Sequence, residues 1–156
     1  MTQRISFHSS RRTGGFTLVE LMIACVVLAI IVAVAMPSYQ AQVRKSRRAD
    51  ARNAILDLAG REERFLSIAN SYSQTPTDVG YTGAFPVTVN NGYYQLSVTV
   101  PDPNQAPGIT SYLITATTFG PQVTDTDCQT FTVNQLGQQA ALNSGGALNT
   151  ATCWGI

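Results

Sequence analysis

The sequence predicts an α+β fold in which one long N-terminal helix packs on a small antiparallel β-sheet. An apolar run over residues 16–36 is followed by a stretch over 38–70 that is rich in Ala, Arg, Leu and Glu. After Tyr72 the composition changes to Thr, Gly, Pro, Asn and Gln with alternating β-branched residues. We therefore expect four segments: a basic leader (1–15), a hydrophobic helix (16–37), an amphipathic helix (38–72) and a globular head (73–156).

Charge is sparse and unevenly distributed along the 156 residues. Charged residues make up 12% of the chain, about half the share that is usual in soluble domains. The formal charge is +3 over residues 1–15 and +2 over 16–64, and it falls to −4 over 65–156, which contain no Lys or Arg. A head without cations has little affinity for a polyanion, so the sequence disfavours nucleic acid as a partner.

The apolar run of 16–36 is long enough to cross a membrane. As a helix it would measure about 31 Å, which matches a bilayer core of about 30 Å. A secretory signal peptide shares this pattern of basic leader and apolar segment, and Ala33-Val34-Ala35 supplies a cleavage site of the A-x-A type. A soluble binding protein secreted after cleavage behind Ala35 is therefore an alternative.

Glu20 argues against a plain signal peptide. A carboxylate in an apolar helix costs about 2.5–3.5 kcal/mol at mid-bilayer, and such acids usually have a partner. Gly14-Gly15 just before Phe16 forms a flexible stretch that a protease can bind. Cleavage after Gly15 would create an α-amino group at Phe16, about 6 Å of helix rise from Glu20, so this carboxylate would gain a cationic partner.

The stretch from Gly15 to Leu21 (Gly-Phe-Thr-Leu-Val-Glu-Leu), set between a short basic leader and a long apolar helix, resembles the N-terminal motif of type IV prepilins. The resemblance implies that a prepilin peptidase cuts between Gly15 and Phe16 and methylates Phe16. It also implies that Glu20 takes part in subunit docking. Pro37 matches a proline where the family's helix loosens, and proline inside a helix costs about 3 kcal/mol, so we expect a kink or unwinding over 36–39.

The same resemblance implies a location and partners. The chain would lie in the bacterial inner membrane with its head in the periplasm, and in an extracellular pilus after assembly. Its partners would be other pilin subunits, the peptidase, the inner-membrane assembly machinery and, before assembly, the lipid bilayer. Counting bases alone conflicts with this orientation, since three flank the apolar run before it and five after it. The motif takes precedence here.

The helix beyond the membrane carries an apolar stripe that we expect to pack on the sheet. Its residues recur at spacings near three and four, and they are Ala51, Ile55, Leu58, Phe65, Ile68 and Tyr72. The charged residues of 44–52 and 61–64 are placed on other faces, where Arg48, Arg52, Glu62 and Glu63 are available for ion pairs between subunits.

About four strands are expected in the head, over 85–90, 93–100, 112–118 and 128–134, with Asn91-Gly92 as a hairpin turn. The loop 79–84 would connect helix and sheet. Cys128 and Cys153 lie in a domain that the motif places outside the cytoplasm, which suggests a disulfide around the last hairpin. Type IV pilins share such a C-terminal disulfide. Cys25 is interpreted as a small apolar helix residue.

No enzyme chemistry is indicated. The single histidine, His8, lies in the leader, and no residue pattern suggests catalysis, a metal site or a cofactor. Residues 61–65, residues 70–72 and Cys153-Trp154-Gly155 are most similar to PilE-type minor pilins. We therefore expect a structural subunit, a minor pilin that helps to initiate or join pilus assembly. A major type IV pilin and a type II secretion pseudopilin are the alternatives.

Overall fold

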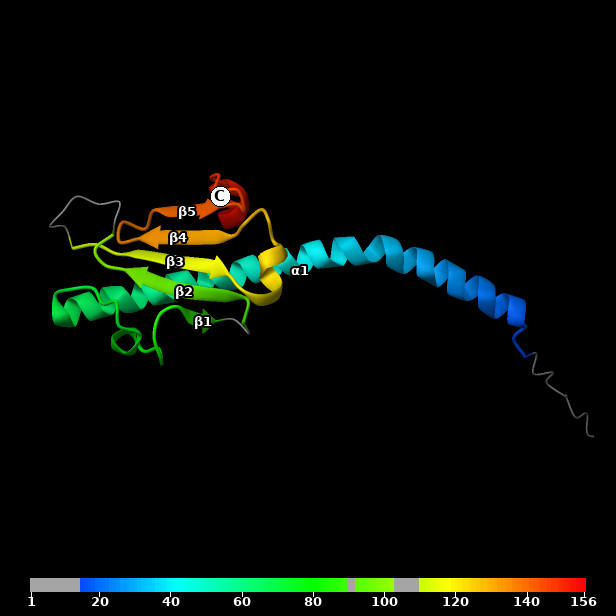
Figure 1. The fold of residues 1–156 in the computed structure, drawn as a ribbon, viewed down its shortest axis with the longest axis horizontal. Coiled ribbons are helices and arrows are strands. Elements are labelled where there is room, and N and C mark those ends of the chain that lie inside the picture. The colour runs from blue at the N-terminus through cyan, green and yellow to red at the C-terminus, as the bar shows by residue number, and fades with distance from the viewer. Residues whose placement is uncertain (1–14, 90–91, 103–109) are drawn as a thin grey trace, which may run out of the picture. The chain divides into compact units, whose positions relative to one another are not determined.

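A computed structural model describes residues 15–89, 92–102 and 110–156 (Figure 1). The leader bases, His8, Asn91 of the predicted hairpin turn and most of the loop 101–108 lie outside these residues. The chain divides into two compact units, Met1–Gln40 and Ala41–Ile156, which are described separately below.

Helix α1 runs from Leu18 to Ala69 and contributes to both units. It continues through Pro37, and residues 36–39 are all helical, so the local unwinding expected there is absent. The kink itself stays a prediction. Residues 15–40 are exposed throughout, including the whole apolar run, so this part of the chain has no core of its own.

The second unit contains a five-stranded antiparallel sheet in the order β1-β2-β3-β4-β5. Its strands are β1 (Val87–Val89), β2 (Tyr94–Thr99), β3 (Leu113–Thr118), β4 (Thr130–Asn134) and β5 (Gln139–Leu142). The first four fall within the predicted segments, and the α+β class is confirmed. The expectation of about four strands was one too few. The sequence of β5, Gln-Ala-Ala-Leu, lacks β-branched and aromatic residues, so only its pairing with β4 identifies it.

One face of the sheet packs against α1. Strand alternation directs Leu96, Ala116, Phe131 and Ala141 to this face in a single cross-strand row. The row belongs to the same core as three predicted stripe residues, Ala51, Ile55 and Leu58, which are fully buried. Phe65 and Tyr72 pack partly against this core.

The predicted stripe was wrong at its C-terminal end. Ile68 is 82% exposed, and the next buried position of α1 after Leu58 is Glu62. A 3₁₀ turn, Pro76–Val79, precedes the connection to the sheet, and its Pro76 and Val79 are buried. The expected loop over 79–84 therefore begins inside this turn.

Candidate functional site

The N-terminal unit presents the predicted processing site at the start of α1. Residues 15–17 are not helical, and the Thr17 Oγ1 accepts a hydrogen bond from the backbone N–H of Glu20 at 3.2 Å. Thr17 is thus the N-cap of α1, and Glu20 occupies the first helical turn, where the helix dipole favours a carboxylate. The Thr-x-x-Glu spacing is a capping-box pattern that sequence analysis overlooked.

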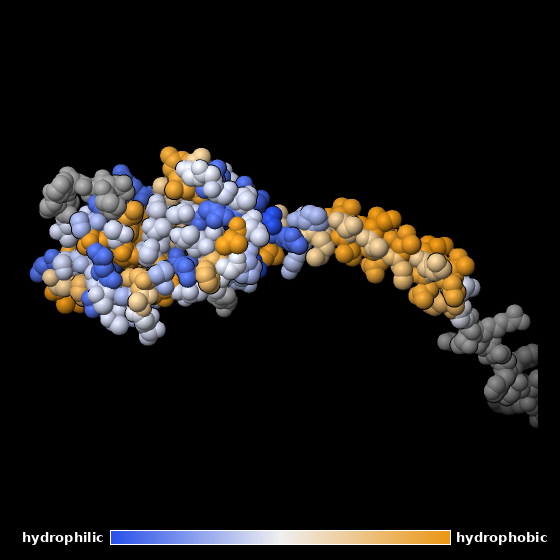
Figure 2. Space-filling model, in the orientation of Figure 1, coloured by the Kyte–Doolittle hydropathy of each residue, from blue (hydrophilic) through white to orange (hydrophobic). Residues whose placement is uncertain are grey.

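Beyond Glu20 the helix offers only apolar surface for the next turns. Its most apolar window has a mean hydropathy of 3.0 and none of it is buried, so by length and composition α1 can cross a membrane. Figure 2 shows this segment as a continuous orange surface. Glu20 is the single charged residue between residues 16 and 43. The anchor therefore combines a large apolar surface with one carboxylate.

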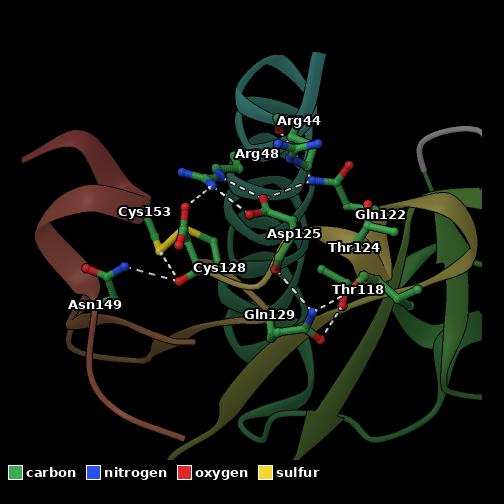
Figure 3. A network of polar contacts seen from close by, with 12 residues as sticks. Arg44, Arg48, Thr118, Gln122, Thr124, Asp125, Cys128, Gln129, Asn149 and Cys153 are labelled. Atoms are coloured by element: carbon green, nitrogen blue, oxygen red, sulfur yellow. Dashed lines mark hydrogen bonds and ion pairs between the residues drawn. A yellow bond between two sulfur atoms is a disulfide. The ribbon is translucent and has the colours of Figure 1, made fainter. Parts of the chain in front are cut away.

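The head is tied to α1 by an ion pair that sequence analysis did not predict. The Arg48 Nε and Nη2 donate to the two carboxylate oxygens of Asp125, at 2.7 and 2.6 Å (Figure 3). Both side chains are buried, and Nη2 also reaches the exposed Asp127 at 3.3 Å. The hydrogen bonds to Asp125 raise the pKa of Arg48, against the opposing effect of burial. The pair fastens residues 125–127 to the helix.

Neighbouring side chains reinforce this attachment. Gln122, fully buried, donates from Nε2 to the Asp125 carboxylate at 3.1 Å and to the backbone oxygen of Arg44 at 3.3 Å (Figure 3). The Arg47 guanidinium lies 3.8 Å from the ring centroid of Tyr93, and Arg52 donates to the backbone oxygen of Trp154. These contacts join three parts of the head, the loop of Gln122, Tyr93 and Trp154, to one segment of α1.

The placement of the charged residues on other faces is therefore wrong for Arg48 and Glu62. Arg48, Ala51, Ile55, Leu58 and Glu62 share the buried stripe of α1, with the two charged residues at its ends. Arg48 is buried and paired with Asp125 of the same chain, so it is not available for the ion pair between subunits that was expected.

Glu62 anchors the segment that follows α1. Its Oε2 accepts the backbone N–H of Ser73 at 3.0 Å, and its Oε1 is buried with no hydrogen-bond partner among the described residues. Burial raises the pKa of Glu62, the Ser73 bond opposes this, and the charges of Asp78 and Glu63 add to the increase. A proton on Glu62 is thus held more tightly in the folded head than in the unfolded chain.

The predicted disulfide is confirmed. Cys128 and Cys153 are bonded with an S–S distance of 2.05 Å, and both are buried (Figure 3). The bond joins the chain just before β4 to the C-terminal segment that follows β5. Trp154, next to Cys153, packs edge-on against Phe131 and donates to the backbone oxygen of Ala140 at 3.0 Å. Cys25 is a free, exposed thiol on the apolar helix.

No group of three or more His, Cys, Asp or Glu side chains is placed to bind a metal ion within the described residues. An exposed apolar helix with one carboxylate, continuous with a helix that packs on a disulfide-bonded antiparallel sheet, defines a pilin. Residues 10–36 match the family model described as the prokaryotic N-terminal methylation motif. Residues 37–132 match the family model described as type IV minor pilin ComP, DNA uptake sequence receptor. The chain belongs to this family of type IV pilins, whose members are structural subunits and not enzymes.

Two relatives illustrate the similarity. The type IV major pilin protein PilA of Myxococcus xanthus (strain DK1622) is 29% identical over 91 residues, which are 58% of this chain and 40% of the relative. The match therefore spans less than half of that relative's length. A type IV pilin from Shewanella oneidensis of known structure is 21% identical, with a TM-score of 0.44, and the match covers 62% of this chain and 89% of that one.

Proposed function

We propose that the chain is an inner-membrane prepilin that is cut between Gly15 and Phe16, methylated at Phe16 and then incorporated into a type IV pilus. The fully exposed apolar surface of residues 18–36 carries this proposal. Such a surface needs lipid or other apolar helices, because water disfavours it by about 25 cal/mol per Å². A bilayer before assembly and a bundle of like helices afterwards meet this need in turn.

Glu20 is proposed as the residue that selects the position of the chain in the helix bundle. It is the only charge on the apolar surface, so its most favourable location is beside a cation such as a free α-amino group. The amine of Phe16 on the same or a neighbouring subunit supplies that charge after cleavage. Thr17 supports this role because its N-cap bond orders the turn that carries Glu20.

The mass of the exported chain tests the processing step. We expect a mature N-terminus at Phe16, with the mass of one added methyl group. Cleavage after Ala35, with an N-terminus at Met36, would identify a secreted soluble protein and contradict the proposal. The same measurement on membranes and on sheared pili follows the chain from its anchored to its assembled form.

A low-abundance role in initiating or joining pili is the finer proposal. The description of the matched family supports it, and so does the composition of residues 65–156, which have four acids and no base. A surface that covers a whole filament usually carries charges of both signs. Quantitative mass spectrometry of sheared pili should find this chain at a small fraction of the main subunit. If it were the dominant component, the minor role would be wrong and the pilin assignment would stand.

A DNA receptor is the second candidate, because the family description includes one. The charges of this chain oppose it. Arg48 is buried, Arg52 contacts Trp154, and Arg61 pairs with Asp57 at 2.7 Å, so three of the seven bases in residues 41–69 are already engaged. We expect the full chain to retain labelled duplex DNA no better than a charge-matched protein. Retention that Lys45→Ala and Arg64→Ala abolish would establish the receptor role.

A further inference from the structure

We propose that the two ends of the head along α1 are complementary, so that loop 119–127 of one copy docks on a pocket at the C-terminal end of α1 in the next copy. This inference rests on the proposed function, since it concerns how subunits meet in a filament. Both surfaces belong to the second unit.

The first surface is loop 119–127, which holds apolar side chains out into solvent. Phe119 is 43% exposed and Val123 is 52% exposed. The loop is held rigidly, because Gln122 binds the Arg44 backbone and Gln129 donates to the backbone oxygen of Val123 at 2.7 Å. A fixed loop loses little conformational entropy on binding, so its apolar side chains can contribute to affinity.

The same loop carries a negative charge. The Asp127 side chain is 68% exposed and makes one ion contact, at 3.3 Å, with an arginine whose main partner is Asp125. Asp127 therefore keeps most of its surface and hydrogen-bonding capacity for another cation. The loop thus combines two exposed apolar side chains with one exposed carboxylate.

The second surface is a pocket of about 220 Å³ beside the last turns of α1. Its lining combines arginine and apolar side chains with one acid: Arg61, Arg64, Phe65, Ile68, Asp78, Val79 and Gly80. Ile68 is 82% exposed, far more than any other large apolar residue of the head's helix. Its apolar side chain lies outside the core and is available to another surface.

The charges of the pocket favour an acidic loop. Arg64 donates to the backbone oxygen of Gly60 at 3.2 Å, and none of the ion pairs among the described residues includes it. Asp78, the acid of the lining, is held by the hydroxyl of Ser73 at 2.6 Å. Arg64 is therefore the available partner for an incoming carboxylate, and Phe65 and Ile68 for an incoming apolar side chain.

The two surfaces lie at opposite ends of the head. Loop 119–127 contacts α1 at Arg44 and Arg48, and Arg64 follows Arg48 by sixteen residues, or about 24 Å of helix rise. Figure 1 shows the same separation: the segment before β4 lies beside the cyan part of α1, and the C-terminal end of α1 lies at the opposite ends of the strands. Different surfaces at opposite ends produce a head-to-tail contact, which repeats along an open filament and does not close into a dimer.

Cysteine crosslinking tests the contact. Cells that overproduce the chain would express Ile68→Cys/Val123→Cys on a Cys25→Ser background, so that copies meet one another whatever their share of a native pilus. After mild oxidation of membranes and sheared pili we expect most copies to shift from the monomer band to a ladder of dimers and higher multimers. Either single cysteine variant should stay monomeric. The matched control is Leu56→Cys/Val123→Cys, because Leu56 is 47% exposed but lies midway along the head's helix.

A charge variant provides the second readout. Arg64→Glu should reduce the crosslinked fraction of the Ile68→Cys/Val123→Cys chain, and Arg64→Lys should preserve it. Overproduced chain that accumulates without the ladder, or an equal ladder from the Leu56 control, would overturn the inference. The proposed function fails separately, if the wild-type chain is missing from the pili of its own cells.

Discussion

Replacement of Arg48 by methionine should destabilise the head more than any other single charged-to-apolar change on the helix. The substitution keeps much of the side-chain volume and removes both hydrogen bonds to Asp125, whose side chain is 1% exposed. A buried carboxylate left without its partner costs about 3–5 kcal/mol. Since a domain is stable by about 5–15 kcal/mol, this is a large share of the total.

Trp154 makes the measurement specific to the head. It is the only tryptophan of the chain and is 6% exposed, so its fluorescence follows unfolding of the head in urea with the full chain in mild detergent. With a slope of about 2 kcal/mol per M, the midpoint of Arg48→Met should fall by about 2 M. Arg61→Met is the control, because its pair with Asp57 is exposed and is worth under about 1 kcal/mol.

A double variant separates the loss of the pair from the loss of a side chain. Arg48→Met/Asp125→Leu removes both charges, and an apolar replacement of a buried ion pair is often neutral or stabilising. We expect the double variant to recover most of the lost stability. The reasoning is refuted if Arg48→Met unfolds at the wild-type midpoint, or if Arg61→Met loses as much.

Three further predictions address the other sites. Glu62→Gln should stabilise the head at pH 7, because burial raises the folded pKa of Glu62: its favourable contribution is present in acid and lost as pH rises through that pKa. The advantage of the variant should therefore vanish at about pH 4, and an equal advantage at pH 4 and pH 7 would contradict this. Cys128→Ser should lower stability by about 3 kcal/mol and expose the head to proteolysis, whereas Cys25→Ser should not, and free thiols at Cys128 and Cys153 in exported protein would contradict this. Glu20→Ala should leave membrane insertion and leader cleavage intact but reduce recruitment into pili beside wild-type subunits. Normal recruitment would show that Glu20 has no docking role and serves only in the first helical turn.

Sequence periodicity predicted the helix and the centre of its buried stripe because apolar residues supply an unambiguous signal there. It could not find the ends of the stripe. Arg48 and Glu62 continue the three-and-four spacing of Ala51, Ile55 and Leu58, but a charged residue is assigned to solvent unless its partner is known. Asp125 lies 77 positions away, and only the folded sheet brings it to Arg48.

Local sequence supplied the N-terminal site residues Gly15, Phe16 and Glu20, which stay predictions that rest on the resemblance to prepilins. The disulfide was predictable because both cysteines lie in a head that the same resemblance places outside the cytoplasm. The Thr17 cap was also visible as a Thr-x-x-Glu pattern. The pocket at the end of α1 was not predictable, because it joins α1 to residues 78–80 of the following segment. The prediction placed its Ile68 in the core.

The five strands contain no charged residue, and the main ion pair that joins the head to α1, between Arg48 and Asp125, is buried. Dissolved ions screen exposed charges over a Debye length of about 10 Å at 0.1 M, but they weaken buried pairs much less. The stability of this head should therefore hardly vary with salinity. A pilus subunit built in this way should keep the same fold in fresh water, in brackish water and in the sea.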